Sequence, residues 1–125
     1  MAGGHLGFQK AQISDSAFCL DTLVEDTLSA VRPHEERSGK AIPVIAAGGI
    51  YTGEDIHRLI DLGAAGVQMA TRFVTTHECD AHIRFKQAYL HTEEKDLVII
   101  DSPVGLPGRA IQNDFLKEVT AGVQK

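Results

Sequence analysis

Two short segments of this sequence carry residues that bind anions, and each comes directly after an apolar run. Gly48-Gly49 follows the first run, and Ala70-Thr71-Arg72 follows the second. Glycine lets a backbone approach a phosphate closely, and a helix that follows offers unpaired amides and the positive end of its dipole. Thr71 adds a hydroxyl and Arg72 adds a positive charge. The pattern predicts a phosphate site; the alternative is that Gly48-Gly49 only permits a tight turn.

A histidine between glycines is the second candidate for chemistry, in the segment Gly3-Gly4-His5-Leu6-Gly7. An imidazole titrates near neutral pH, so His5 has the properties of a general base or of a group that positions a proton acceptor. The alternative is an ordinary loop histidine close to the chain terminus.

The segment His77-Glu78-Cys79-Asp80-Ala81-His82 has the composition of a metal site but not its spacing. In the zinc motif HExxH the two histidines lie four residues apart on one helical face. Here they lie five apart, which is about 140° off that face. We therefore expect no metal and interpret the segment as a capped helix start. Cys19 and Cys79 form no CxxC pair, and no evident base accompanies either thiol.

The elements that position the two anion-binding segments form a strand–helix–strand unit. Residues 42–47 predict a parallel strand covered on both faces, and residues 67–70 predict a second strand. Between them, Thr52 and Asp55 indicate a capped helix start, and Gly63 indicates the helix end. Such short loops require a right-handed crossover and a parallel sheet. Both anion-binding segments should then lie at the carboxyl ends of adjacent strands, where α/β barrels hold phosphates.

The rest of the chain predicts three further helices and one strand. The first helix begins at Ser14 or Ser16 and stops near Pro33, and residues 33–40 form a charged surface loop. Residues 102–108 contain too many turn residues for regular structure. The remaining apolar patterns predict a helix with Ala81, Phe85, Ala88 and Tyr89, a strand over residues 97–100, and a last helix with Ile111, Phe115, Leu116 and Val119.

Length and charge limit the class of protein. The chain has 125 residues, which suits one domain, and a net charge of -5, which favours neither nucleic acid nor an anionic membrane as a partner. It has no apolar run long enough to span a bilayer and no signal peptide, so we expect a cytoplasmic protein. A closed (β/α)₈ barrel takes about 250 residues. Two barrel-type strands cannot close one.

Six segments, in order along the chain, resemble the nitronate monooxygenase family, formerly called 2-nitropropane dioxygenases. The flavin-dependent enoyl-ACP reductases are close relatives of that family. Each motif alone is weak, but the ordered set is specific. The segments are AGGHLG at 2–7, PVIAAGGI at 43–50, VQMATRF at 67–73, HECDA at 77–81, FKQAY at 85–89 and SPVGLPGRAI at 102–111.

The resemblance implies an α/β fold that is the C-terminal part of an FMN-binding TIM (β/α)₈ barrel, in an enzyme that oxidises alkyl nitronates with O₂. It assigns His5 as the catalytic base or proton-handling group. Ala70 stands where the family usually has glycine, and its amide stays available if its φ is negative. The residues that the resemblance places against FMN or its phosphate are Gly3, Gly4, Gly48, Gly49, Gln68, Met69, Ala70 and Thr71.

The resemblance also implies that residues 1–125 form a single partial domain, because Met1 stands where the family is in mid-barrel. We expect this segment to be inactive alone. Two alternatives remain open at this point. One is a flavin-dependent enoyl-ACP reductase that uses NAD(P)H, and the other is a non-catalytic truncated chain. An incomplete barrel exposes sheet edges and apolar faces, which promotes self-association.

Overall fold

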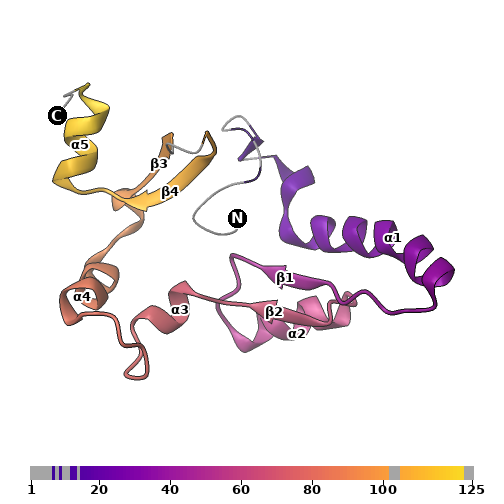
Figure 1. Ribbon diagram of the computed structural model, residues 1–125. Coiled ribbons are helices and arrows are strands. Elements are labelled where there is room, and N and C mark those ends of the chain that lie inside the picture. The colour runs from indigo at the N-terminus through magenta and orange to yellow at the C-terminus, as the bar shows by residue number, and fades with distance from the viewer. Residues whose placement is uncertain (1–6, 8, 10–11, 14, 102–104, 123–125) are drawn as a thin grey trace.

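A computed structural model describes residues 7, 9, 12–13, 15–101 and 105–122 of the chain. Figure 1 shows a mixed α/β arrangement with two separate two-stranded sheets, one parallel and one antiparallel. Short connecting helices join the part of the chain that holds the parallel sheet to the part that holds the antiparallel one. Among the described helices, none has both the length and the apolar character that a membrane span requires.

The parallel sheet belongs to a strand–helix–strand unit made of β1 (Ile45–Ala47), α2 (Gly53–Asp61) and β2 (Gly66–Gln68). The two strands pair in parallel, with Ala47 opposite Gln68. The predicted unit is therefore confirmed, although each strand is shorter than the apolar run that predicted it. Parallel pairing directs both strands toward one edge of the sheet, where their carboxyl ends meet.

One face of the parallel sheet is covered and the other is open. Ala46 is 2% exposed, whereas the side chains of Ile45 and Ala47, which alternate to the opposite face, are exposed. The prediction that this strand is covered on both faces is wrong. The apolar run is continuous in sequence, but within the described residues helices cover only the face to which Ala46 points.

Helix α2 begins and ends where its flanking residues predict. The Thr52 hydroxyl accepts a hydrogen bond from the Asp55 amide at 3.1 Å, and the Asp55 carboxylate accepts one from the Thr52 amide at 2.9 Å. This reciprocal pair is the predicted capping box. Gly63 follows the helix with a φ of 110°, a left-handed conformation that favours glycine.

Helix α1 (Leu20–Ser38) runs through Pro33 instead of stopping there. The predicted loop over residues 33–40 is therefore wrong for all but its end. A proline inside a helix removes one backbone hydrogen bond at a cost of about 3 kcal/mol, but local bonds support the turns after it. Gly39 ends the helix with a φ of 66°, and its amide bonds to the Glu35 carbonyl at 2.7 Å. The Glu35 carboxylate also accepts from the Ile42 amide at 2.7 Å, which fixes the exit of the chain.

The start of α1 also differs from the prediction. Ser16 opens a short 3-10 helix (Ser16–Phe18) whose cap is Asp15, and Cys19 then precedes α1 without a side-chain cap. Ser14, the other expected cap, lies outside the described residues.

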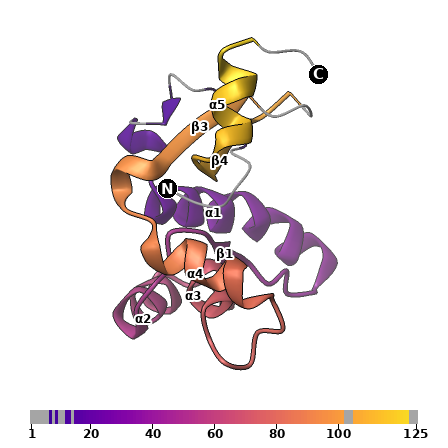
Figure 2. The same ribbon diagram turned by 90° about the vertical axis from the view of Figure 1, so that its left-hand side faces the viewer.

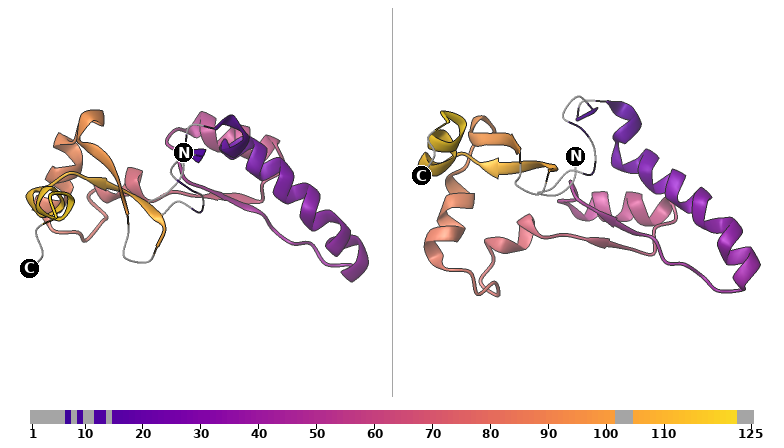
Figure 3. Two further views of the ribbon diagram at one scale, coloured as in Figure 1. Left: turned by 90° about the horizontal axis from the view of Figure 1, so that it is seen from above. Right: turned by 45° about the horizontal axis from the view of Figure 1, so that its top comes forward.

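The hydrophobic core lies between α1, β1 and α2. Leu59 of α2 is fully buried at 0% exposure, and Val24 of α1 reaches the same cluster as Ala46. Since Ala46 points to one face of the sheet only, both helices pack on that face. Figure 2 and Figure 3 show α1 running alongside the unit. The full cluster comprises Val24, Ala46, Ile50, Leu59 and Ala64, with the partly buried Leu20, Leu28, Ile56, Leu62, Val67 and Met69 around it.

The second part of the chain is a hairpin followed by a helix. β3 (Leu97–Asp101) confirms the predicted strand, and it pairs antiparallel with β4 (Pro107–Ile111), which the sequence did not predict. Residues 107–108, which were expected to be irregular, therefore belong to a strand. Ile111, which was expected in the last helix, belongs to the same strand. Proline is tolerated as the first residue of a strand, so Pro107 is not an obstacle. α5 (Asp114–Thr120) follows and is capped by Asn113, whose side chain accepts from the Leu116 amide at 2.9 Å.

Two helices connect the parts. α3 (Thr71–Val74) is a single turn directly after the parallel sheet, and α4 (Ile83–His91) confirms the predicted third helix. His82 is the N-cap of α4, and its Nδ1 accepts from the Arg84 amide at 3.2 Å. The interpretation of this segment as a capped helix start is therefore confirmed.

Candidate functional site

The two predicted anion-binding segments lie at the same edge of the parallel sheet. Gly48-Gly49 leaves β1 directly after Ala47. Ala70-Thr71-Arg72 follows β2, whose last residue, Gln68, pairs with Ala47. Figure 1 shows the turn after β1 and the start of α3 at the end of the sheet toward which both strands run. Adjacent carboxyl ends of parallel strands are where α/β proteins bind ligands.

The turn after β1 requires glycine at two successive positions. Gly48 has a φ of 91° and Gly49 a φ of 69°, both in the left-handed region. A side chain in that conformation costs about 1–2 kcal/mol. Ala46 before the turn and Ile50 after it are both buried in the core, so the glycine backbone is held at a defined place on the surface.

The helix after this turn does not offer its amides as freely as the sequence predicts. The Asp55 carboxylate accepts hydrogen bonds from the amides of Tyr51 and Thr52, at 2.9 Å each, and from the Thr52 hydroxyl at 3.0 Å. The bonds from the Thr52 and Tyr51 amides hold the pKa of Asp55 below its ordinary value. Because a carboxylate already occupies this end of α2, the glycine backbone and the segment after β2 are the remaining anion donors.

The segment after β2 presents a backbone that alanine accommodates. Ala70 has a φ of -124°, so the substitution for the family's usual glycine causes no left-handed strain there. Thr71 begins α3, and no side chain caps that turn. The first amides of a helix have no partner within it. Met69 packs against the core and offers this edge only its backbone, while Gln68 is exposed.

A contact between a cation and an aromatic ring links the loop after β1 to the start of α3, after β2. The guanidinium carbon of Arg72 lies 4.5 Å from the centroid of the Tyr51 ring. Arg72 was expected to add charge here, but sequence reasoning missed Tyr51. The contact depends on the strand register that brings the two loops together, and no local motif signals it.

Lys86 of α4 fixes the loop that follows α3. Its ammonium donates to the backbone carbonyls of Thr76 at 2.6 Å and Cys79 at 2.5 Å. Glu78 lies in the same loop. The Glu78 carboxylate accepts hydrogen bonds from the Glu78 backbone amide and from the Thr76 side chain, and these bonds lower its pKa. The loop borders a shallow hollow lined by Ala70, Phe73, Val74, Thr76, Glu78 and Cys79.

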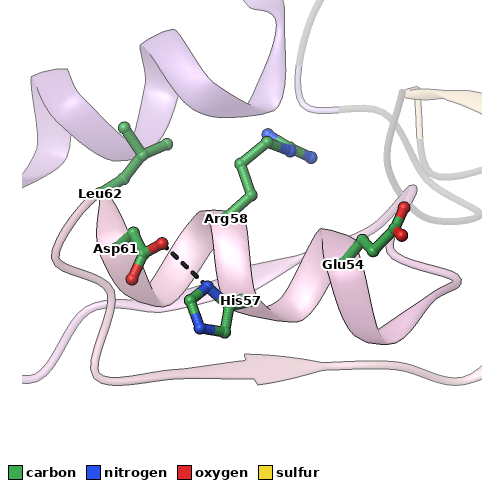
Figure 4. A pocket seen from close by; sticks show the side chains of 5 residues that line it. All are labelled: Glu54, His57, Arg58, Asp61 and Leu62. Carbon is green, nitrogen blue, oxygen red and sulfur yellow. Dashed lines mark hydrogen bonds and ion pairs between the residues drawn. The ribbon is translucent and has the colours of Figure 1, made fainter.

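Another hollow follows the outer face of α2 and is separate from the sheet edge. Figure 4 shows the His57 ring beside Asp61, with Nδ1 2.8 Å from the carboxylate. Arg58 points toward α1, where it forms an ion pair with Asp21, and this contact raises the pKa of Arg58. The ion pair between Arg58 and Asp21 joins α1 to α2, so we assign these two side chains to the packing of the helices. The lining is completed by Glu54 and Leu62.

Three predicted site residues have no structural description. His5, the predicted catalytic residue, and the glycines Gly3 and Gly4 lie outside the described residues. The part of the site that the structure describes is therefore the predicted phosphate end, formed by the residues that follow β1 and β2.

Comparisons with known proteins identify relatives over nearly the whole chain. The family described as nitronate monooxygenase matches residues 1–124. A probable nitronate monooxygenase of Staphylococcus saprophyticus is 37% identical over 118 residues, which are 94% of this chain and 31% of that protein. One from Staphylococcus haemolyticus is 46% identical over 77 residues, which are 62% of this chain and 22% of that protein. The resemblance predicted from the ordered motifs is confirmed.

Two solved structures are also similar to nearly the whole chain. FabK from Thermotoga maritima aligns with a TM-score of 0.65 and 32% identity, covering 96% of this chain and 33% of that one. A mutant of the same protein aligns with a TM-score of 0.68 and 30% identity, covering 97% of this chain and 34% of that one. The chain therefore spans between about a fifth and about a third of the length of these relatives, from 22% to 34%.

Proposed function

The chain belongs to the nitronate monooxygenase family, and on that basis we propose that its sheet edge holds the phosphate of FMN in an enzyme that oxidises alkyl nitronates with O₂. The observation that carries the proposal is the pair of left-handed glycines, Gly48 and Gly49, at the same edge of a parallel sheet as Ala70-Thr71-Arg72. The glycines leave that backbone without side chains where a phosphate would approach.

The chemistry of the donors suits a phosphate. Two glycine amides, the Thr71 amide and hydroxyl, and the Arg72 guanidinium are all donors, and charge-assisted hydrogen bonds to phosphate are about twice as strong as neutral ones. The carboxylate of Asp55, six residues after Gly49, is engaged with the amides of Tyr51 and Thr52. It therefore does not compete for the glycine backbone.

The chain's own residues would bind and orient, while FMN when bound supplies the electron transfer. We propose that the segment 68–71 and the two glycines hold the phosphate, with Gly3 and Gly4 beside the flavin. His5 would handle the substrate's proton as a general base. Such groups contribute about 10²–10⁴ in rate, so His5→Ala should lower turnover by that factor while FMN stays bound.

We further propose that the family activity needs the remaining strands of a (β/α)₈ barrel. Ligand sites bury about 70–90% of a drug-sized ligand, and the described residues offer only the phosphate end of such a site. The 125 residues alone should therefore bind FMN weakly. The open sheet face should favour association with another chain.

A chimera tests the proposed function. In the Staphylococcus saprophyticus protein, the 118 aligned residues are replaced by the matching residues of this chain. We expect FMN to co-purify and O₂ to be consumed with an alkyl nitronate. Turnover of an enoyl thioester with NAD(P)H, without nitronate turnover, would favour the reductase alternative. A chimera that folds, by circular dichroism, but lacks FMN would contradict the proposed site.

Two glycine variants of the chimera test whether FMN binding depends on the sheet edge. Gly49→Val places a branched side chain at a φ of 69°, so FMN content should fall sharply. Gly53→Ala, at the first position of α2 and with no atom within 4 Å of the added carbon, should leave FMN content unchanged. Equal FMN content in both variants would count against the assignment of Gly48-Gly49.

A further inference from the structure

We infer that Tyr51 holds Arg72 in place as the counter-charge of the phosphate site, so that Arg72 is a binding residue and Tyr51 a positioning residue. The inference rests on the proposed function, which already counts Arg72 among the phosphate donors, and adds Tyr51 as the residue that positions it. It concerns the contact across the sheet edge, with the Arg72 guanidinium carbon 4.5 Å from the Tyr51 ring centroid.

Both residues flank the predicted donors. Tyr51 comes two residues after Gly49, and Arg72 comes directly after Thr71. Among the described residues, the contact of the Arg72 guanidinium with the Tyr51 ring connects a charged side chain after β2 to a side chain after β1. It therefore joins the loop after β1 to the loop after β2 at the place where the strands already pair.

The partner of Arg72, the Tyr51 ring, carries no charge. No carboxylate is recorded with Arg72 in the described part of the chain. Asp55, in the first turn of α2, faces the amides of Tyr51 and Thr52 and, at 3.7 Å, the guanidinium of Arg58. An aromatic ring attracts a cation through its quadrupole without cancelling the charge. Arg72 thus keeps a full positive charge at the sheet edge, whereas a carboxylate partner would neutralise it.

The ring is itself well placed by the backbone. The Tyr51 amide donates to the Asp55 carboxylate at 2.9 Å, so the backbone of Tyr51 is part of the cap of α2. Its side chain is 53% exposed and leaves one face for Arg72. Contact with this ring limits the rotamers of the long Arg72 side chain, which lowers the entropy lost when Arg72 binds an anion. The chemistry fits a phosphate group, with which a guanidinium can form two parallel hydrogen bonds.

The test follows amide signals of the ¹⁵N-labelled chain during titration with inorganic phosphate, against sodium chloride of equal ionic strength. Weak binding is sufficient for this measurement, so it does not depend on a complete flavin pocket. In the wild type, phosphate should shift the amides of Gly48, Gly49 and Thr71. Arg72→Gln should weaken phosphate binding about tenfold, the loss of one charge-assisted bond.

The Tyr51 variants separate positioning from folding. Tyr51→Leu should weaken phosphate binding about threefold, whereas Tyr51→Phe keeps the ring and should change it less than about twofold. Unshifted amides of Ala46 and Leu59, both in the core, verify that each variant is folded.

Each outcome decides one statement. No phosphate shift at Gly48, Gly49 and Thr71 in the wild type would overturn the proposed phosphate site, and the inference with it. A wild-type shift that Arg72→Gln leaves at the same affinity would overturn the inference alone. If Arg72→Gln weakens binding but Tyr51→Leu does not, the positioning part of the inference is wrong.

Discussion

The region from α1 to β2 and the region from α4 to α5 are held together in different ways. In the first, all the hydrophobic residues of the core come from α1, β1, α2 and the loops beside them. In the second, the ordered contacts are the pairing of β3 with β4 and the caps of the helices. Seven of its large apolar residues are exposed, namely Ile83, Phe85, Leu90, Leu97, Leu106, Phe115 and Val119.

The difference bears on the candidate site. Gly48-Gly49 lies between two buried residues, Ala46 and Ile50, so the first region fixes that half of the site. Thr71 and Arg72 lie where the chain leaves the first region for the second. Packing of a core thus positions one half of the site, and strand pairing and the Tyr51 contact position the other.

The largest effect should come from removing the most buried side chain of the first region. Leu59→Ala should lower the free energy of unfolding by about 2–5 kcal/mol, because Leu59 is 0% exposed and the truncation leaves a cavity. Phe115→Ala in α5, where the ring is 63% exposed, should change it by less than about 0.5 kcal/mol. Urea unfolding of both variants measures this. Similar losses would show that the second region is packed as the first is.

The next effect separates two glycines of the first region. Gly49→Ala should cost about 1–2 kcal/mol, because Gly49 has a φ of 69°. Gly53→Ala is the matched control at the start of α2, where an added carbon meets no atom within 4 Å. It should stabilise the protein by about 0.4–1 kcal/mol through the unfolded chain. Opposite signs are expected in urea unfolding, and a loss in both variants would contradict the difference in backbone conformation.

The same contrast explains which elements the sequence predicted. In the first region, Thr52, Asp55 and Gly63 are local signals that agree with the apolar spacing of α2, so strand, helix and strand were all predicted. The predicted placement of Gly48-Gly49 and Ala70-Thr71-Arg72 at one sheet edge follows from parallel pairing alone.

The errors arise where a local signal meets a longer-range interaction. Pro33 favours a helix end, but the bonds of Glu35 to Gly39 and Ile42 support the last turns of α1. Pro107 and Ile111 read as turn and helix, yet pairing with β3 makes them a strand. Cross-strand partners are not visible in a local pattern, and the contact of Tyr51 with Arg72 was missed for the same reason.

A smaller effect compares the helix caps of the two regions. Thr52→Ala removes the acceptor of the Asp55 amide and should lower the free energy of unfolding by about 1 kcal/mol. Asn113→Ala removes the acceptor of the Leu116 amide in α5. Because α5 contributes nothing to the core, this variant should reduce helix content by circular dichroism while the urea midpoint stays nearly unchanged. Equal shifts of the midpoint would mean that α5 unfolds together with the core.

The smallest effect is a dependence of stability on pH. Hydrogen bonds from the amides of Thr52 and Tyr51 hold the pKa of Asp55 below its ordinary value in the folded protein. A lowered folded-state pKa stabilises the protein above the unfolded pKa, about 3.9, and this contribution is lost as the pH falls through the folded value. The urea midpoint should therefore decrease on acidification, and Asp55→Asn should make that decrease shallower.

Glu78 provides the control from the connecting loop. Its pKa is also lowered, by the bond from its own backbone amide and by the Thr76 side chain. No residue of that loop belongs to the core cluster, so its opening should be separate from unfolding of the first region. Glu78→Gln should then leave the acid dependence of the urea midpoint as it is in the wild type. If Glu78→Gln made the decrease as shallow as Asp55→Asn does, the loop and the core would unfold as one unit. The connection that contains Thr71 and Arg72 would then belong to the same unfolding unit as the first region.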